Sequence, residues 1–254
     1  MMTIDVLTLF SAMFTGPFDS SMIKRARDKG LLEINFTDIR NFSGNKHNTV
    51  DDTPYGGGAG MVLQAPPVMH ALQHVWGKRS NQKARIVLMC PTGMPFNQQW
   101  ARDLAEEDHL IIICGHYEGF DERVRELAIM DELSIGDYVL TGGELPAMVV
   151  VDAVARMIPG VLGEFSSAQE DSFYQGLLDY PHYTRPAEYA GLAIPEVLMS
   201  GHHEKIRLWR RRQALLKTLG RRPELLHSGK LSNEDVSLLR EIANDIQAVL
   251  KNYR

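Results

Sequence analysis

A glycine-rich stretch and two aspartates form the first group of residues that could do chemistry. Four glycines occur within Tyr55–Met61, and Asp51 and Asp52 lie shortly before them. Without a Cβ, such a loop lets backbone N–H groups approach a phosphate or a base, and the carboxylates offer acceptors for the N–H edge of guanine. The stretch is neither a P-loop nor a dinucleotide fingerprint, because it lacks both glycine patterns. A tight turn containing ordinary turn aspartates is the alternative interpretation.

Three further loops follow apolar runs or contain glycines. Met89–Gly93 and Cys114–Arg123 follow strand-like runs, and Ile135–Gly143 contains three glycines. In open α/β sheets, ligands bind outside the carboxyl ends of the strands. We therefore expect the three loops to meet at one pocket, where backbone groups hold a polar cofactor and apolar side chains cover its ring. The alternative is three unrelated turns.

Other polar residues carry weaker signals when they are taken alone. Glu170 and Asp171 lie in a polar stretch without period, where acids are usually solvated and inert. Arg156, near the end of an apolar helix, is typical of a surface or ion-paired arginine. His182 lies between a proline and a tyrosine and could carry a proton or only form hydrogen bonds in a rigid turn.

A cluster of positive charge lies in residues 201–222. Eight cations and one acid give this stretch a local charge of +7, in a chain whose net charge is −5. A helical projection places cations on one side and apolar residues on the other. The first side holds Arg207, Arg210, Arg211, Lys217 and Arg221, and the second holds Leu208, Trp209, Leu215, Leu216 and Leu219. This pattern predicts a phosphate-binding surface, with a solvated helix face as the alternative.

The elements that position these residues alternate along the first 160 residues. Short runs rich in Ile, Val and Leu predict strands at Ile4–Leu9, Leu32–Thr37, Arg85–Met89 and Leu110–Cys114. Amphipathic or long apolar segments predict helices at Ser20–Lys29, Pro66–Val75, Asn97–Glu106 and Ala147–Met157, the third with Asn97 as its N-cap. This alternation favours an α/β fold in which helices cover a mostly parallel sheet.

Composition and length define the class of protein. The chain has 254 residues, of which 44% are hydrophobic and 23% charged, as is ordinary for a globular protein. Cys90 and Cys114 predict buried free thiols in a reducing compartment and fit no zinc pattern. The first residues lack the basic region and the long apolar stretch that are typical of a signal peptide, and no apolar run reaches the ~20 residues of a membrane span. We therefore expect a soluble cytosolic protein without a membrane partner.

The change of texture after Gly160 predicts two domains. We expect an α/β domain over residues 1–160 and a flexible, polar linker over residues 161–175. A smaller, mostly α-helical domain is expected over residues 176–254, with two or three helices after His202.

Several strings resemble bacterial tRNA (guanine-N1)-methyltransferases of the TrmD type. The resemblance extends from about residue 4 to about residue 227. The strings that carry it are Val50–Met61, Cys114–Val124, Ser134–Leu140, Gly142–Met148, Ile158–Gly163, Glu170–Phe173, Pro181–Pro186 and Arg222–Leu226.

The resemblance implies an enzyme of the SPOUT class that uses S-adenosylmethionine. Its implied reaction is methylation of N1 of the guanosine immediately 3′ of a tRNA anticodon, in support of reading-frame maintenance. It also implies a homodimer with active sites between subunits and a deep trefoil knot in the N-terminal domain. The alternation of elements alone predicts an open sheet, because knots are nearly absent among protein folds.

The resemblance also assigns roles to residues. The implied general base is Asp171, with Arg156 stabilising O6 of guanine and Glu118 as a further acidic site residue. A magnesium ion near Glu118 and Asp171 is a further implication. The expected cofactor contacts are Leu88, Met89, Cys90, Pro91, Gly115, Tyr117, Glu118, Gly119, Ile135, Gly136, Tyr138, Leu140, Gly142, Gly143 and Pro146. The expected tRNA contacts are Asp51, Gly60, Arg185, Arg207, Arg210, Arg211 and Lys217.

One loop departs from the family pattern. Members usually carry Tyr-Leu-Ser-Pro at the first cofactor loop, whereas this chain has Leu88-Met89-Cys90-Pro91. The change removes two polar side chains and leaves the backbone contacts possible. Two other functions compete with the main hypothesis: a non-catalytic RNA-binding protein, and a SPOUT methyltransferase that acts on another RNA.

Overall fold

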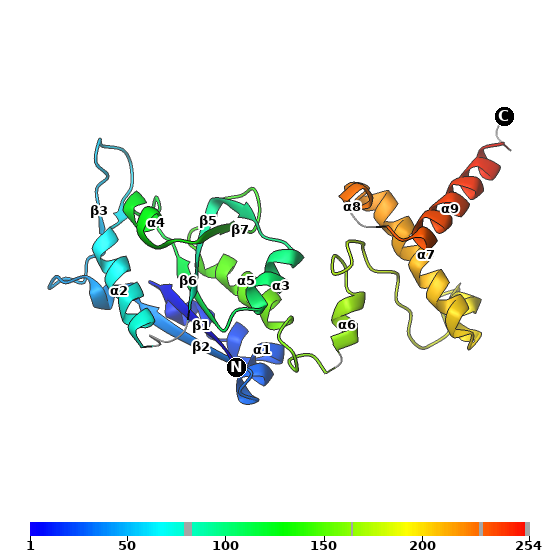
Figure 1. Cartoon of the computed structure of the whole chain (residues 1–254), viewed down its shortest axis with the longest axis horizontal. Coiled ribbons are helices and arrows are strands. Elements are labelled where there is room, and N and C mark those ends of the chain that lie inside the picture. The colour runs from blue at the N-terminus through cyan, green and yellow to red at the C-terminus, as the bar shows by residue number, and fades with distance from the viewer. Residues whose placement is uncertain (79–82, 164, 229–230, 252–254) are drawn as a thin grey trace. The chain divides into compact units, whose positions relative to one another are not determined.

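The chain folds into two compact units. The structure, a computed structural model, describes residues 1–78, 83–163, 165–228 and 231–251. The units are Met1–Phe165 and Ser166–Arg254 (Figure 1).

A parallel five-stranded sheet forms the centre of the first unit. The strand order is β2-β1-β6-β5-β7, and Ile4 of β1 lies opposite both Ile34 of β2 and Leu110 of β6. The strands are β1 (Met2–Thr8), β2 (Leu32–Asp38), β5 (Arg85–Pro95), β6 (His109–Cys114) and β7 (Asp131–Ser134). β1 and β6 are buried along their whole length, as expected for parallel strands covered on both faces. The predicted parallel α/β architecture is thereby confirmed.

Helices cover both faces of this sheet (Figure 1). On one face lie α1 (Ser21–Asp28), α3 (Gln98–Ala105) and α5 (Glu144–Ala155), and on the other α2 (Ala65–Gly77) and α4 (Glu122–Ala128). Successive strand residues point to opposite faces. Met89 of β5 therefore belongs to the core beside α5, whereas Leu88 belongs to the core beside α2.

The predicted strands and helices of this unit are present with small shifts at their ends, except that β5 continues to Pro95 instead of ending at Met89. Asn97 caps α3, because its side chain accepts a hydrogen bond from the amide of Trp100 at 3.1 Å. α5 begins at Glu144, three residues before the predicted start. The short helix α4 and the strand β7 were not predicted. Three of the four residues of β7 (Asp-Glu-Leu-Ser) are polar, which an edge strand tolerates.

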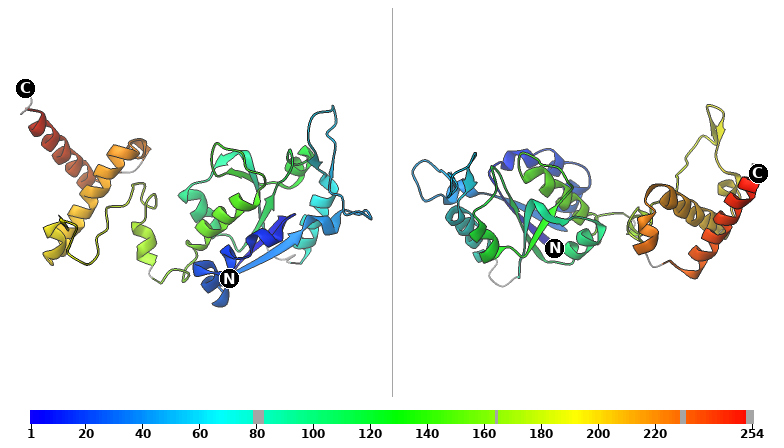
Figure 2. Two further views of the ribbon diagram at one scale, coloured as in Figure 1. Left: turned by 180° about the vertical axis from the view of Figure 1, so that it is seen from behind. Right: turned by 90° about the horizontal axis from the view of Figure 1, so that it is seen from above.

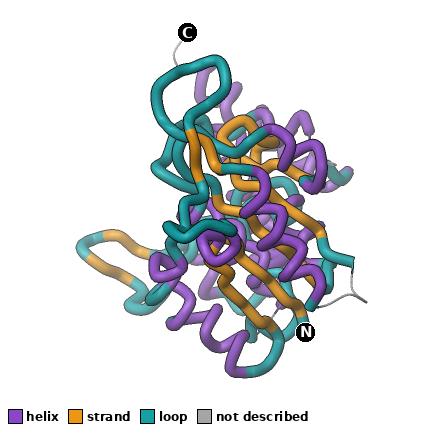
Figure 3. The backbone as a smooth tube through the Cα atoms, turned by 90° about the vertical axis from the view of Figure 1, so that its left-hand side faces the viewer, coloured by secondary structure: helices purple, strands orange, loops and turns teal. Residues whose placement is uncertain are grey.

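A short hairpin carries the glycine-rich stretch. Its strands, β3 (Asp51–Asp52) and β4 (Val62–Leu63), pair in antiparallel register. The intervening loop stands clear of the sheet (Figures 1 and 3). The backbone of Leu63 donates to Gly119 and accepts from Asp121, each at 2.9 Å. The hairpin is therefore tied to the loop that follows β6.

The second unit is built around two long helices. α7 (His203–Arg221) and α9 (Asn233–Lys251) pack together, with α8 (Glu224–Ser228) between them in sequence. Their core contains Leu177, Ala214, Leu215, Leu238 and Ile242. Residues 181–200 extend from these helices and carry the hairpin of β8 (Glu188–Tyr189) and β9 (Leu192–Ala193) (Figure 2). Short 3-10 turns occur in the two units at Ser11–Phe14, Pro17–Asp19, Ile39–Phe42 and Glu196–Met199.

Part of the predicted irregular linker is helical. Residues Phe165–Glu170 form α6, and Ala168 within it is buried. Burial of this small side chain gives the polar segment a packing contact that its lack of period did not reveal.

Candidate functional site

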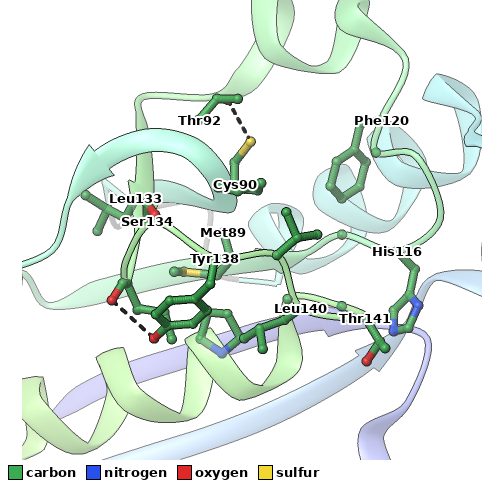
Figure 4. Close-up of a pocket in the computed structure, with 18 of the residues that line it drawn as sticks. Met89, Cys90, Thr92, His116, Phe120, Leu133, Ser134, Tyr138, Leu140 and Thr141 are labelled. Atoms are coloured by element: carbon green, nitrogen blue, oxygen red, sulfur yellow. Dashed lines mark hydrogen bonds between the residues drawn. The ribbon is translucent and has the colours of Figure 1, made fainter.

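The first loop, which is a bulge within β5, and the loops that follow β6 and β7 surround a pocket of about 290 Å³ (Figure 4). The lining mixes exposed backbone at glycines with apolar side chains such as Leu133 and Leu140, as a polar cofactor with a flat ring requires. The lining residues are Met89, Cys90, Pro91, Thr92, Gly115, His116, Tyr117, Glu118, Gly119, Phe120, Arg125, Leu133, Ser134, Ile135, Gly136, Tyr138, Val139, Leu140, Thr141, Gly142, Gly143 and Pro146.

Every residue predicted to contact a cofactor lines this pocket except Leu88. The side chain of Leu88 is fully buried and belongs to the core beside α2. Its neighbour Met89 points the opposite way and reaches the pocket, as strand alternation requires. The assignment of a pocket contact to Leu88 therefore overlooked the pleat of β5.

The first loop leaves the regular sheet between Met89 and Met94. Both of these residues pair with Leu133 of β7, so four residues bulge out between them. Gly93 lets the bulge close on β7, because a Cβ there would lie 2.5 Å from the backbone carbon of Glu132.

Arg125 of α4, which the sequence analysis did not identify, contacts this bulge. Its Nη2 donates to Sγ of Cys90 at 3.4 Å, and its Nε and Nη1 donate to Glu132 and Glu122 at 3.2 and 2.8 Å. Burial alone would lower the pKa of the Arg125 guanidinium. The hydrogen bonds raise it by more, so the pKa lies above its usual value.

The second loop brings the glycine-rich stretch to the pocket. The amide of Glu118 donates to the carbonyl of Met61 at 2.9 Å. Gly60, whose φ is +83°, lies directly against the Glu118 side chain, so that any Cβ there would clash with this carboxylate. Asp51 pairs with Leu63 on the same hairpin. Gly60 thus lies against Glu118, which lines the pocket, whereas Asp51 is connected to this loop only through its pairing with Leu63.

The third loop ends at a buried carboxylate that the sequence analysis also did not identify. Glu144, the first residue of α5, is fully buried and accepts a hydrogen bond from the Thr8 hydroxyl at 2.6 Å. Its other oxygen lies 3.1 Å from Nε2 of His116 in the second loop. Together with desolvation, which is the larger effect, this carboxylate raises the pKa of the Cys114 thiol well above its usual value. The network joins β1, the second loop and α5.

Arg156 and Asp171 lie at the ends of two different helices. Arg156 is half-buried at the C-cap of α5, in the first unit. Asp171 is exposed and follows α6, in the second unit, where its amide donates to the carbonyl of Ala168 at 3.3 Å.

Asp171 lines a groove of about 670 Å³ within the second unit, together with Glu170, Tyr180 and Arg210. The Tyr180 hydroxyl donates to Glu170 at 2.6 Å, and the Arg210 guanidinium carbon lies 5.0 Å from the centre of the Tyr180 ring. Burial and the bond to Glu170 raise the pKa of Tyr180 to about 12. Tyr180 therefore stays protonated at neutral pH and fixes the end of α6 beside Asp171.

The predicted basic face of α7 is only partly available. Arg211 donates to both oxygens of buried Asp235 at 2.6 and 2.9 Å, and Arg207 binds Glu204 and Glu234. Arg211 is thus held against α9, whereas the side chain of Arg207 remains 50% exposed, and the phosphate-binding surface stays a prediction. The predicted apolar side was also imperfect, since Leu219 is 41% exposed.

The remaining predicted tRNA contacts of the second unit differ in whether their side chains are paired with a carboxylate. Lys217 pairs with Asp179 at 2.5 Å and lowers the pKa of that carboxyl. Arg185 is exposed, and Arg210 contacts no carboxylate among the described residues. Of the positions predicted on α7, Arg210 is the best placed to meet a phosphate.

The Arg211–Asp235 pair gives a pH-dependent prediction. The hydrogen bond from Arg211 lowers the pKa of Asp235 from its usual 3.8 to about 2. The pair therefore stabilises the fold above about pH 4, and this contribution is lost as the pH falls toward 2. We expect D235N to lower the free energy of unfolding of the second unit by about 2 kcal/mol at pH 7.

This difference between D235N and the unaltered protein should shrink toward zero near pH 2. The measurement is the urea dependence of hydrogen exchange in α7 and α9 peptides. D245N is the control, because Asp245 is 68% exposed and pairs with Arg212 at the surface. Equal stability of D235N and D245N at pH 7 would contradict the assigned role of the buried pair.

Neither a metal centre nor a membrane span is found in the parts of the chain that the structure describes. There, no three histidine, cysteine or acidic side chains cluster so that they could hold a metal ion. Glu118 belongs to the first unit and Asp171 to the second, and neither is part of such a cluster among the described residues. No described helix is both long and apolar enough to cross a bilayer.

Comparison with known proteins gives one consistent match. Residues 2–228 match the family described as tRNA (Guanine-1)-methyltransferase TrmD. A tRNA (guanine-N(1)-)-methyltransferase of Desulforamulus reducens is 62% identical over 96% of this chain and 96% of its own length. Proteins with the same description from Pelotomaculum thermopropionicum and Brevibacillus brevis are 62% and 54% identical, over 95% and 96% of this chain and 96% and 99% of their own.

Proposed function

The chain belongs to the TrmD family of tRNA (guanine-1)-methyltransferases, and from this premise we propose its substrate, cofactor and catalytic residues. It transfers the methyl group of S-adenosylmethionine to N1 of the guanosine immediately 3′ of a tRNA anticodon. The observation that carries this proposal is the convergence of three loops on one pocket, with the glycine-rich hairpin bound to its edge.

The pocket suits a cofactor that combines polar groups with a flat ring. Gly119 leaves the backbone of the second loop open, since a Cβ there would meet no other atom within 4 Å, and Leu133, Ile135 and Leu140 supply apolar surface. When S-adenosylmethionine is bound, its sulfonium supplies an electrophilic methyl group. The protein's part is to bind and orient this donor and to keep water away.

The acceptor nitrogen needs activation by the protein. Guanine N1 carries a proton and is a poor nucleophile until that proton leaves. We assign its removal to the carboxylate of Asp171, which lies with Arg210 in the groove of the second unit. As the proton leaves, negative charge gathers on O6, where the Arg156 guanidinium donates a hydrogen bond. Glu118 acts beside the pocket as the further acidic residue.

Two copies of the chain are needed to complete the proposed active site. Val139 is 84% exposed, and Leu145 and Val149, one turn apart on α5, are each about half exposed. A second copy of the chain would cover this apolar surface beside the pocket. We propose a homodimer in which Asp171 of one protomer meets the cofactor pocket of its partner.

A deep trefoil knot would explain how the loops are held together. The amide of Gly143 donates to the carbonyl of Gly115 at 2.8 Å, and Gly142 forms a bridge with His116. These contacts hold the third loop against the second, as a knot in which residues 135–155 pass through the loop made by the preceding strands would require. We propose this SPOUT-type knot for the first unit.

The RNA contacts proposed for the second unit centre on Arg210 and Arg185. Asp51 and Gly60, on the hairpin of the first unit, would contact nucleotides around the target. The segment that carries Asp171 is proposed to complete the site only when tRNA binds. Arg207, Arg211 and Lys217 contribute to the same surface indirectly, because each of them holds in place the carboxylate with which it pairs.

A salt titration tests the role of Arg210. We expect R210Q to weaken tRNA binding and to reduce the slope of log K against log salt by about 0.9, the value for one lost phosphate contact. R212Q is the matched control, because Arg212 is committed to Asp245 at 2.7 Å. Filter binding between 50 and 200 mM salt measures both variants. An unchanged slope for R210Q would show that Arg210 faces solvent.

Transfer of a labelled methyl group tests the proposed reaction. Two tRNA transcripts should be compared, identical except that one has guanosine and the other adenosine directly 3′ of the anticodon. We expect label in the first transcript only. Equal labelling of both transcripts would favour a methyltransferase with another target, and labelling of neither would contradict the proposal.

A further inference from the structure

The first loop of the pocket lacks the backbone hydrogen bonds that hold the rest of β5. Met89 and Met94 both pair with Leu133, so no residue of β7 pairs with residues 90–93. On the other side, the pairing of β5 with β6 ends at Met89 opposite Cys114. The loop nevertheless forms one wall of the pocket. Its position must therefore be set by contacts other than the sheet ladder.

The Arg125 guanidinium supplies such contacts from α4. One group donates to Sγ of Cys90 in the loop, to Glu132 in β7 and to Glu122 in its own helix. The Cys90 sulfur also lies 3.0 Å from the Thr92 hydroxyl, so the residue that Arg125 holds is itself bonded to a second residue of the loop. In Figure 4 the Cys90 and Thr92 side chains lie together at one end of the pocket.

We infer that Arg125 is a positioning residue, which fixes the first loop through the Cys90 sulfur and thereby sets the affinity for S-adenosylmethionine. This inference rests on the proposed function. It assigns a purpose to Cys90, because its sulfur accepts the hydrogen bond that anchors the loop.

The charges around Arg125 favour this role over direct contact with the donor. A bare guanidinium in the pocket would repel the sulfonium of S-adenosylmethionine. Here Glu122 and Glu132 offset the positive charge, and their bonds hold the planar fork so that one nitrogen points at Cys90. Arginine suits the task because its five donors serve three partners at once.

A double-mutant cycle on Cys90 and Arg125 tests the inference. We expect C90A and R125M each to raise the Kd for S-adenosylhomocysteine about tenfold, as for a lost hydrogen bond to a charged donor. The double variant should bind no more weakly than R125M, because both changes remove the same link. At saturating S-adenosylmethionine, kcat should stay within about twofold of the unaltered enzyme.

Two further variants separate positioning from general damage. C90S keeps an acceptor at the loop and should bind nearly as tightly as the unaltered protein. R123Q is the matched control on the same helix, because Arg123 is exposed and pairs with Asp121 outside the pocket. Calorimetric titration gives Kd, and thermal unfolding of each variant shows whether the fold has changed.

Additive effects of C90A and R125M would overturn the inference, because Arg125 would then act on the ligand directly. Unchanged affinity in both variants would overturn it as well, as would a failure of C90S to restore binding. If the unaltered protein binds neither S-adenosylmethionine nor S-adenosylhomocysteine, the proposed function fails and this inference fails with it. If the unaltered protein binds these ligands but C90A and R125M show no coupling, only this inference is overturned and the proposed function stands.

Discussion

Replacement of Asp171 by asparagine is expected to lower kcat by about 10²- to 10⁴-fold, the usual contribution of a positioned general base. The amide cannot accept the N1 proton, so guanine stays a poor nucleophile even when the donor is bound. Single-turnover methyl transfer with saturating tRNA and S-adenosylmethionine measures the effect on chemistry. The Kd for S-adenosylhomocysteine should not change, because the donor pocket lies in the first unit.

The matched control for D171N is E196Q. Glu196 is an exposed carboxylate of the same unit and does not line the groove that contains Asp171. E196Q should turn over at the rate of the unaltered enzyme. If D171N retained that rate, Asp171 would not be the base, and the proposed chemistry would need a different proton acceptor.

The second large effect is expected at the junction between the second loop and α5. An alanine at position 143 would place its Cβ 2.7 Å from Cα of Cys114 and 2.8 Å from the amide nitrogen of Gly115. Both obstacles are backbone atoms, so they cannot rotate away. Because the φ of Gly143 is −80°, the strain of G143A would come from this close approach alone. We expect cofactor affinity to fall by about 100-fold or more, since two walls of the pocket must separate.

G77A is the control for G143A. Gly77 ends α2, and a Cβ there would meet no other atom within 4 Å. It should leave cofactor binding unchanged and raise helix stability slightly. Calorimetric titration with S-adenosylhomocysteine compares the two variants. Tight binding by G143A would mean that the loops of the first unit are not locked together as described.

The sequence predicted the pocket better than the contacts that support it. Apolar runs identified β5 and β6, and parallel strands place the loops after them at one edge of a sheet. The pocket is formed in large part by the backbone of these loops, so its prediction depends on few specific side chains. By contrast, Thr8 and Glu144 are 136 residues apart and meet only in the fold. No rule of sequence spacing could have predicted that contact, nor the contact between Arg125 and Cys90.

The polar edge strand was missed, and the pairing of several α7 cations was not foreseen, for a related reason. Charged residues were assessed within their own segments, whereas their partners lie elsewhere. Asp131 of β7 binds Arg85 of β5 at 2.7 Å, so a strand with two acids is stable at the edge of the sheet. Arg211 is held by an acid of α9. A count of charge within residues 201–222 omits carboxylates outside this stretch that pair with some of its cations, such as Glu234 and Asp235.

Mass-spectrometric mapping of modified nucleosides tests the central claim most directly. Unmodified bulk tRNA should be incubated with the purified protein and S-adenosylmethionine, digested to fragments and compared with a D171N reaction. The account predicts one new methyl group, at N1 of the guanosine immediately 3′ of the anticodon, that is absent with D171N. A methyl group at another position, on a ribose hydroxyl, or on no nucleotide would contradict it.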